Sequence, residues 1–138
     1  MKDRTIHLTE FDLDRLKRLL AAKGSLDGPD KQYLRDLKDA LDRAVVVPST
    51  DIPPDVITMN SRFRMTDLDT GEESEYTLVF PGTANIVKGR LSVLAPVGTA
   101  LLGRKESDVI EWTVPVGIKR FRIDKVLYQP EVAEAFHL

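Results

Sequence analysis

The spacing of the hydrophobic residues changes abruptly within this chain of 138 residues, and this change constrains the fold most. Before residue 45, leucines recur at steps of three and four, which is typical of one face of an α-helix. After residue 55, apolar and polar residues alternate, which is typical of β-strands with one buried face. Three prolines between these parts, at residues 45–54, disfavour continued helix. The pattern predicts an α+β protein with two units, residues 1–47 and 48–138.

The first unit carries two leucine stripes separated by a turn. Residues 24–29 contain two glycines and a proline, a composition that breaks a helix. Thr9 is a suitable N-cap for the helix before the turn, and the helix after it is expected to begin at Pro29 or Asp30. Two such helices predict a short antiparallel hairpin with a coiled-coil seam, each arm roughly 20 Å long. The stripes are Leu13, Leu16 and Leu20, then Leu34, Leu37, Leu41 and Ala44.

The charged residues of both helices are expected on solvated faces, where they form pairs four residues apart. In the first helix they are Asp12, Asp14, Arg15 and Arg18, and in the second they are Lys31, Arg35, Asp36, Lys38, Asp39, Asp42 and Arg43.

The second unit is expected to form an antiparallel sheet of five or six strands with one short helix. A proline at the first helical turn and a glycine just past the last turn frame that helix, between Pro96 and Leu102. The apolar alternation shifts by one residue between Ile123 and Val126, which predicts a β-bulge. A hairpin turn is expected at residues 69–71 and another turn at 115–117. The expected strands are residues 56–59, 62–67, 75–80, 91–94, 109–114 and 118–128.

Composition excludes several classes of protein. The chain has no cysteine, which excludes disulfides and thiolate chemistry. No histidine and carboxylate spacing resembles a metal site, no glycine-rich loop resembles a phosphate cradle, and no serine lies in a nucleophile elbow. Apolar runs are too short to cross a bilayer, and the polar start lacks a signal peptide. We therefore expect a cytoplasmic, monomeric protein without cofactor, metal or catalytic residues.

The charge distribution indicates a protein partner. The formal net charge is −2, with 10 basic and 9 acidic residues in residues 1–47, and 10 and 13 after them. Neither unit has the basic excess that binds a phosphate backbone, so direct sequence-specific contact with nucleic acid is not expected.

Three segments, in this order, resemble a known family. They are residues 55–62 (Asp-Val-Ile-Thr-Met-Asn-Ser-Arg), 95–103 (Ala-Pro-Val-Gly-Thr-Ala-Leu-Leu-Gly) and 126–131 (Val-Leu-Tyr-Gln-Pro-Glu). They resemble the carboxy-terminal domain of the Gre transcript-cleavage factors, and the whole chain resembles the shorter Rnk proteins of that superfamily. The resemblance implies an FKBP-like fold for residues 48–138 and bacterial RNA polymerase as the partner. It implies DNA binding only at family level, and an indirect influence on nucleoside diphosphate kinase.

The expected hairpin tip offers two carboxylates, Asp27 and Asp30. In Gre factors an aspartate and, three residues later, a glutamate at the tip help to hold the second magnesium for transcript cleavage. Here Asp30 replaces the glutamate, and the arms are about half as long as those of cleavage factors. The favoured interpretation is turn chemistry at residues 27–28 with Asp30 as a helix cap. A protein contact and weak transcript cleavage are the alternatives.

The strand-to-helix corner is the second candidate site. In Gre factors the matching loop contacts the rim of the polymerase secondary channel, and the corresponding residues here are Leu94, Ala95, Pro96 and Val97. The alternative is a simple corner with Leu94 in the core. Trp112 alternates with apolar neighbours, so core packing is preferred over a prolyl-isomerase pocket.

The favoured hypothesis is a non-enzymatic regulator that binds RNA polymerase at the secondary channel and competes with Gre-type factors. A weak transcript-cleavage factor and an interaction module with a different partner are the alternatives.

Overall fold

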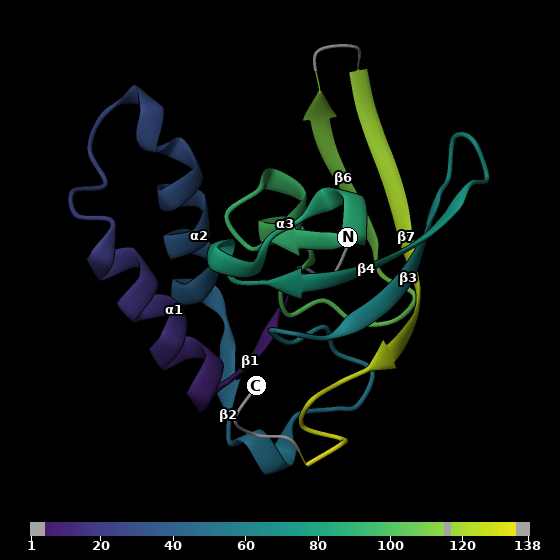
Figure 1. The fold of residues 1–138 in the computed structure, drawn as a ribbon, viewed down its shortest axis with the longest axis horizontal. Helices are drawn as coiled ribbons and strands as arrows, with labels where there is room; N and C mark the ends of the chain where they lie inside the picture. The colour runs from purple at the N-terminus through teal and green to yellow at the C-terminus, as the bar shows by residue number, and fades with distance from the viewer. Residues whose placement is uncertain (1–4, 115–116, 135–138) are drawn as a thin grey trace.

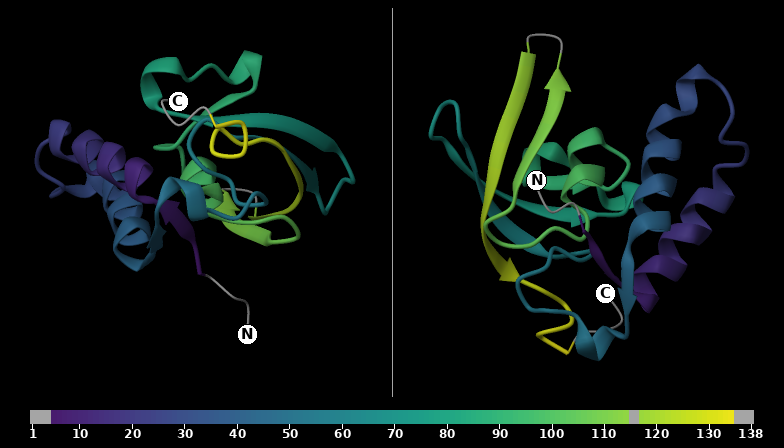
Figure 2. Two further views of the ribbon diagram at one scale, coloured as in Figure 1. Left: turned by 90° about the horizontal axis from the view of Figure 1, so that it is seen from below. Right: turned by 180° about the vertical axis from the view of Figure 1, so that it is seen from behind.

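The fold places a pair of helices beside a curled sheet, with a short third helix between them (Figures 1 and 2). The computed structural model describes residues 5–114 and 117–134, without the side chains of residues 112–114. The sheet strands are β3 (Arg62–Asp67), β4 (Glu73–Val79), β5 (Arg90–Ser92), β6 (Val109–Val114) and β7 (Gly117–Tyr128). The predicted α+β class, with helices first and a sheet with one short helix after them, is confirmed.

The two predicted N-terminal helices are α1 (Glu10–Ala22) and α2 (Gln32–Arg43). The Thr9 hydroxyl accepts a hydrogen bond from the Asp12 N–H at 2.9 Å, so the predicted N-cap is confirmed. The predicted cap at Asp30 is wrong. Asp30 lies inside a 3-10 turn (Pro29–Lys31), and no side chain caps that turn or α2. The turn delays the start of α2 by about one helical turn.

Removing the Thr9 hydroxyl is expected to destabilise the protein. In Thr9→Ala, one N–H at the start of α1 loses its acceptor, and we expect the free energy of unfolding to fall by about 1 kcal/mol. Urea unfolding followed by circular dichroism measures the difference. Thr9→Ser keeps the hydroxyl and is the matched control, expected to lose less than half as much. An equal loss in both variants would contradict the capping role.

A two-stranded parallel sheet lies at the base of the helical pair. Its strands are β1 (His7–Thr9) and β2 (Val45–Val47). The Val45 N–H also donates to the Ile6 carbonyl at 2.9 Å. These bonds fix the entry to α1 beside the exit from α2.

The large sheet has the strand order β5-β4-β3-β7-β6. Its pairs are antiparallel except β4–β5, which is parallel and corrects the prediction of an all-antiparallel sheet. The predicted hairpin turn at residues 69–71 joins β3 to β4, with Gly71 at φ 77°. Arg64 pairs with Lys125 and Met65 with Ile123, so the predicted β-bulge is confirmed at Asp124.

Residues 56–59 do not form the predicted strand: Val56 makes an isolated antiparallel bridge with Lys105, and a turn begins at Met59. All four are buried, which explains their strand-like composition. The Ser61 hydroxyl accepts from the Thr58 N–H at 2.9 Å and also bonds the Thr58 hydroxyl, so the side chains fold the backbone back on itself. Residues 115–116 of the predicted turn at 115–117 and the packing of Trp112 lie outside the described part of the chain.

One hydrophobic core joins the helices to the sheet. Leu16 and Leu37 from the helical pair are fully buried in the same cluster as Phe63 and Ile123 from the sheet. The helical pair therefore docks on the sheet. The division at residues 47 and 48 remains a prediction. Within the described part of the chain, no helix has the length and apolar character needed to span a membrane.

Candidate functional site

The short helix α3 (Pro96–Leu101) fixes the corner that sequence analysis proposed as a contact. Pro96 occupies its first turn, and Gly103 follows it at φ 76°, so the predicted framing by proline and glycine is confirmed. Leu101 and Leu102 are fully buried and hold the helix against the core. Gly98 is buried as well, because the helix lies directly on the Ser92 carbonyl.

The four corner residues differ in exposure. Pro96 is exposed, whereas Leu94, Ala95 and Val97 are partly buried. Leu94 and Val97 pack against the core cluster. The corner therefore presents Pro96 on a rigid support, and the packing of Leu94 matches the simple structural alternative.

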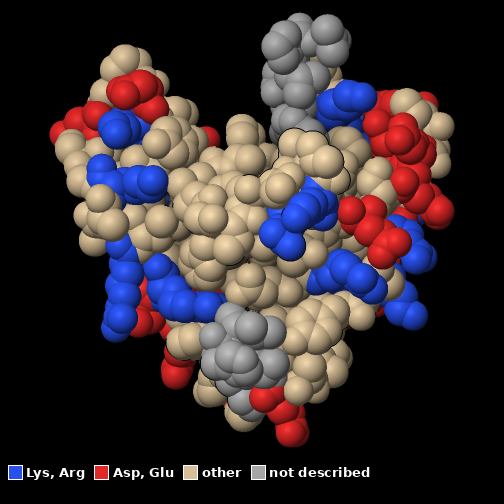
Figure 3. Space-filling view, viewed as in Figure 1, with Lys and Arg blue, Asp and Glu red and all other residues tan. Residues whose placement is uncertain are grey.

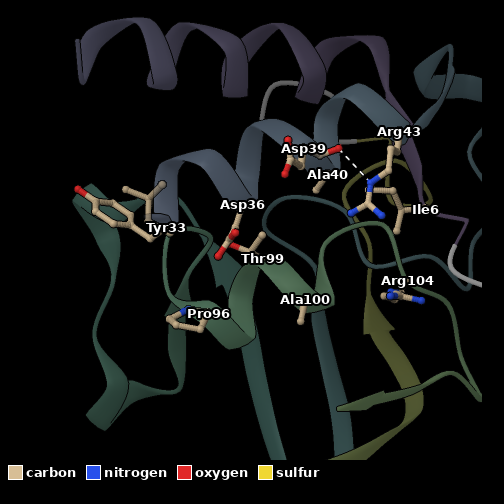
Figure 4. Close-up of a pocket in the computed structure, with 11 residues that line it drawn as sticks. Ile6, Tyr33, Asp36, Asp39, Ala40, Arg43, Pro96, Thr99, Ala100 and Arg104 are labelled. Atoms are coloured by element: carbon tan, nitrogen blue, oxygen red, sulfur yellow. Dashed lines mark hydrogen bonds between the residues drawn. The ribbon is translucent and has the colours of Figure 1, made fainter. Parts of the chain in front are cut away.

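A groove of about 350 Å³ separates α2 from α3 (Figure 4). Tyr33, Asp36 and Asp39 line it from α2, while Pro96 and Thr99 line it from α3. The Arg43 Nε donates to the Asp39 carbonyl at 3.2 Å, which holds this arginine along the helix. The remaining lining residues are Ile6, Ala40, Arg43, Leu94, Ala100 and Arg104.

The hairpin tip is exposed at the end of the helical pair (Figure 1). Asp27 and Asp30 are both exposed, and the Asp27 N–H donates to the Ser25 hydroxyl at 3.1 Å. Gly28 between them has φ 108°, a conformation that favours glycine. Over the described ranges, no group of three or more histidine and acidic side chains could hold a metal ion.

Asp12 is buried, which corrects its predicted place on a solvated face. It has no exposed surface, and its Oδ2 accepts from the Met59 N–H at 2.9 Å. Its Oδ1 accepts from the Arg15 guanidinium at 2.5 Å. Burial raises the pKa of Asp12, although the hydrogen bonds from Arg15 and Met59 oppose the rise. The carboxylate thus ties α1 to the turn before β3.

Three further contacts lie near this carboxylate. The Arg15 guanidinium lies 4.2 Å from the Phe11 ring centroid and 4.8 Å from that of Phe80, which follows β4. The Thr58 hydroxyl donates to Glu131 at 2.7 Å, and burial raises the pKa of Glu131. The Arg15–Phe80 contact, like the Asp12–Met59 hydrogen bond, joins α1 to the sheet unit.

The loop before β5 presents an apolar tip that sequence analysis missed. Val87 is 93% exposed and Ile86 is 65% exposed. The Asn85 side chain accepts from the Lys88 N–H at 3.3 Å, and Gly89 closes the turn at φ 73°. The sequence signal that could have predicted this tip is a pair of aliphatic residues between a turn-forming asparagine and a glycine. Figure 3 shows a largely uncharged surface between the helical pair and the sheet.

A helical pair docked on a mixed curled sheet, with a short helix behind a proline corner, is the architecture of Gre-type transcription factors. The structure of a prokaryotic transcription elongation factor GreA/GreB from Nitrosomonas europaea matches with a TM-score of 0.73 and 40% identity, covering 91% of this chain and 100% of that one. Residues 52–128 match the family model for the transcription elongation factor GreA/GreB C-terminus, and residues 4–47 match the Rnk N-terminus.

Curated relatives match this chain over two different lengths. The regulator of nucleoside diphosphate kinase of Escherichia coli K12 is 37% identical over 131 residues, covering 94% of this chain and 93% of the relative. Transcription elongation factor GreA of Clostridium beijerinckii is 39% identical over 87 residues, covering 63% of this chain and 54% of that factor. The chain therefore belongs to the Rnk proteins of the Gre transcription factor family, as the sequence segments predicted.

Proposed function

We propose that this protein is a non-catalytic regulator that binds bacterial RNA polymerase at the secondary channel and competes there with longer Gre-type factors. The observation that carries this proposal is the length of its arms. The helices α1 and α2 have 13 and 12 residues, and each is about 20 Å long at 1.5 Å per residue. Such a hairpin occupies an entrance but does not reach a metal ion far inside a channel.

The two units would have different roles in binding polymerase. The sheet unit, residues 48–138, would dock through the corner of Leu94, Ala95, Pro96 and Val97, of which Pro96 is exposed. The helical pair, residues 1–47, would stand in the channel mouth. A monomer acting in the cytoplasm suffices for this role. An influence on nucleoside diphosphate kinase would follow indirectly from altered transcription, and this idea rests on the name of the Escherichia coli relative.

Transcript cleavage is the second candidate function. The exposed positions of Asp27 and Asp30 on one turn favour it, because both carboxylates are free to meet a magnesium ion held by a partner. The short arms oppose it. A backtracked elongation complex with magnesium distinguishes the two functions. We expect no shortening of the transcript above the polymerase alone, whereas shortening that disappears in Asp27→Asn and Asp30→Asn would establish cleavage instead.

The corner contact gives a direct test of polymerase binding. Pro96→Asp places a charge on the exposed surface, yet aspartate suits the first turn of a helix, so α3 should still form. We expect binding to core polymerase, measured by pull-down and by fluorescence anisotropy, to weaken at least tenfold. Pro48→Asp changes another exposed proline outside the groove and is expected to bind normally.

These binding measurements test the proposed function and the proposed corner contact separately. Loss of binding in Pro96→Asp alone supports both. Equal binding by both variants overturns the corner contact only. If the wild-type chain fails to bind core polymerase, or binds without displacing a full-length Gre factor, action at the secondary channel is wrong.

A further inference from the structure

The groove between α2 and α3 has the dimensions of a pocket for one long side chain. Its volume of about 350 Å³ lies at the low end for ligand sites and is too small for a docked helix. The helix α2 forms one wall and α3 with its proline corner forms the other (Figure 4). A residue projecting from a protein partner fits this space better than a separate secondary-structure element.

The wall on α2 carries two carboxylates, Asp36 and Asp39, beside the single cation Arg43. Neither Asp36 nor Asp39 has an ion-pair partner among the residues that the structure describes. The Asp36 Oδ1 accepts from the neutral Gln32 amide at 2.7 Å. On another face of the same helix, Asp42 is already paired with Lys38 at 2.7 Å. Asp36 and Asp39 thus line the groove without a direct ion pair in the described part of the chain, and a cation entering the groove would meet them.

The groove also supplies a ring and apolar surface. Tyr33 lies three residues before Asp36, so both project from one face of α2, and the tyrosine is 36% exposed. Pro96 faces them from the opposite side, and Leu94 also lines the groove. A planar cation can lie on the ring and bond the carboxylate while its methylene groups pack on the proline. This combination of contacts suits a guanidinium better than an ammonium.

The residues at the far end of the groove determine where an incoming cation would stop. Arg43 and Arg104 line that end, and their charges repel a second cation. An incoming cation would therefore stop beside Asp36 and Tyr33, near the exposed Pro96.

We propose that the groove between α2 and α3 is an anchor pocket for an arginine side chain of the protein partner, bound by Asp36 and Tyr33 against Pro96. The proposal rests on the proposed function, since it takes RNA polymerase as the partner. It makes the helical pair a part of the docking surface, rather than only an obstruction in the channel.

A free arginine analogue tests the pocket without polymerase. The full-length protein, labelled with ¹⁵N, is titrated with N-acetyl-arginine amide, and the neutral N-acetyl-citrulline amide is the comparison. We expect saturable amide shifts at Tyr33, Asp36 and Thr99 with the arginine compound alone. Asp36→Asn should abolish them, and Asp42→Asn, which removes one charge from another face of α2, should keep them. Equal shifts with citrulline, or shifts unchanged in Asp36→Asn, overturn the proposal.

Binding to core polymerase provides the second measurement. We expect Asp36→Asn to weaken binding about tenfold and Asp42→Asn to change it less than twofold. If wild type binds polymerase and Asp36→Asn binds equally well, the pocket is not used, and the proposed function stands. If wild type does not bind polymerase, the proposed function fails, and the proposal fails with it as an account of polymerase docking.

Discussion

Gly98→Ala is expected to destabilise this protein severely, although alanine normally favours a helix. A Cβ at residue 98 would lie 2.0 Å from the Ser92 carbonyl oxygen and 3.2 Å from the Val93 Cα. Both contacts are with backbone, so no side chain can rotate away. Propensity alone would stabilise the helix by about 1 kcal/mol. Overpacking against fixed backbone costs about 3 kcal/mol or more, and so the clash decides the sign.

The measurement is urea unfolding of the wild type and two variants. Gly82→Ala is the matched control, because its Cβ would meet nothing within 4 Å, and we expect a change below about 1 kcal/mol. A variant Gly98→Ala as stable as the wild type would show that α3 does not lie on the β5 corner as described. Because α3 forms one wall of the groove, the same variant should also weaken polymerase binding.

Local sequence chemistry was enough to predict much of this fold. The leucine stripes, the Thr9 cap and the frame of Pro96 and Gly103 depend on neighbours within a few residues, and each is present in the structure. The bulge at Asp124 was also predictable, since an extra residue in one strand shifts the apolar alternation. The local sequence predicts such features because the interactions that produce them lie within a single segment of the chain.

Features formed between distant segments were not predictable. A strand was expected at residues 91–94, where β5 lies, but the parallel pairing of β1 with β2 and of β4 with β5 depends on partners elsewhere in the chain. The groove joins Asp36 to Pro96, and nothing near either residue signals the other. Asp36 was correctly expected to be exposed, but exposure alone does not reveal what it faces.

Asp12 shows how such a long-range contact can override a local interpretation. Its spacing of four and eight residues from Leu16 and Leu20 places it on the buried face of α1, and this spacing was the available signal. A carboxylate is rarely buried without a partner. The Met59 N–H that accompanies it lies 47 residues away, beyond the reach of any local pattern.

Removing this carboxylate is expected to cost the most of any single polar change in the helical pair. In Asp12→Ala, the buried Met59 N–H and the Arg15 guanidinium both lose their acceptor. Breaking a buried charged pair from one side typically costs about 3–5 kcal/mol. Asp14→Ala is the matched control, because Asp14 and its partner Arg18 are both largely exposed, and a loss below about 1 kcal/mol is expected. Similar losses in the two variants would show that Asp12 does not anchor α1.

The pH dependence of stability distinguishes the effect of the Asp12 charge from the effect of its hydrogen bonds. Burial raises the pKa of Asp12 above its value of 3.8 in the unfolded chain, so the folded state holds the proton more tightly. Ionisation of Asp12 therefore lowers stability as the pH rises from about 3.8 through the raised folded pKa. Asp12→Asn cannot ionise, and its stability relative to wild type should improve over that window. A relative stability that worsens with rising pH would mean that the ion pair with Arg15 outweighs the cost of burial, and that the anchor is held by charge.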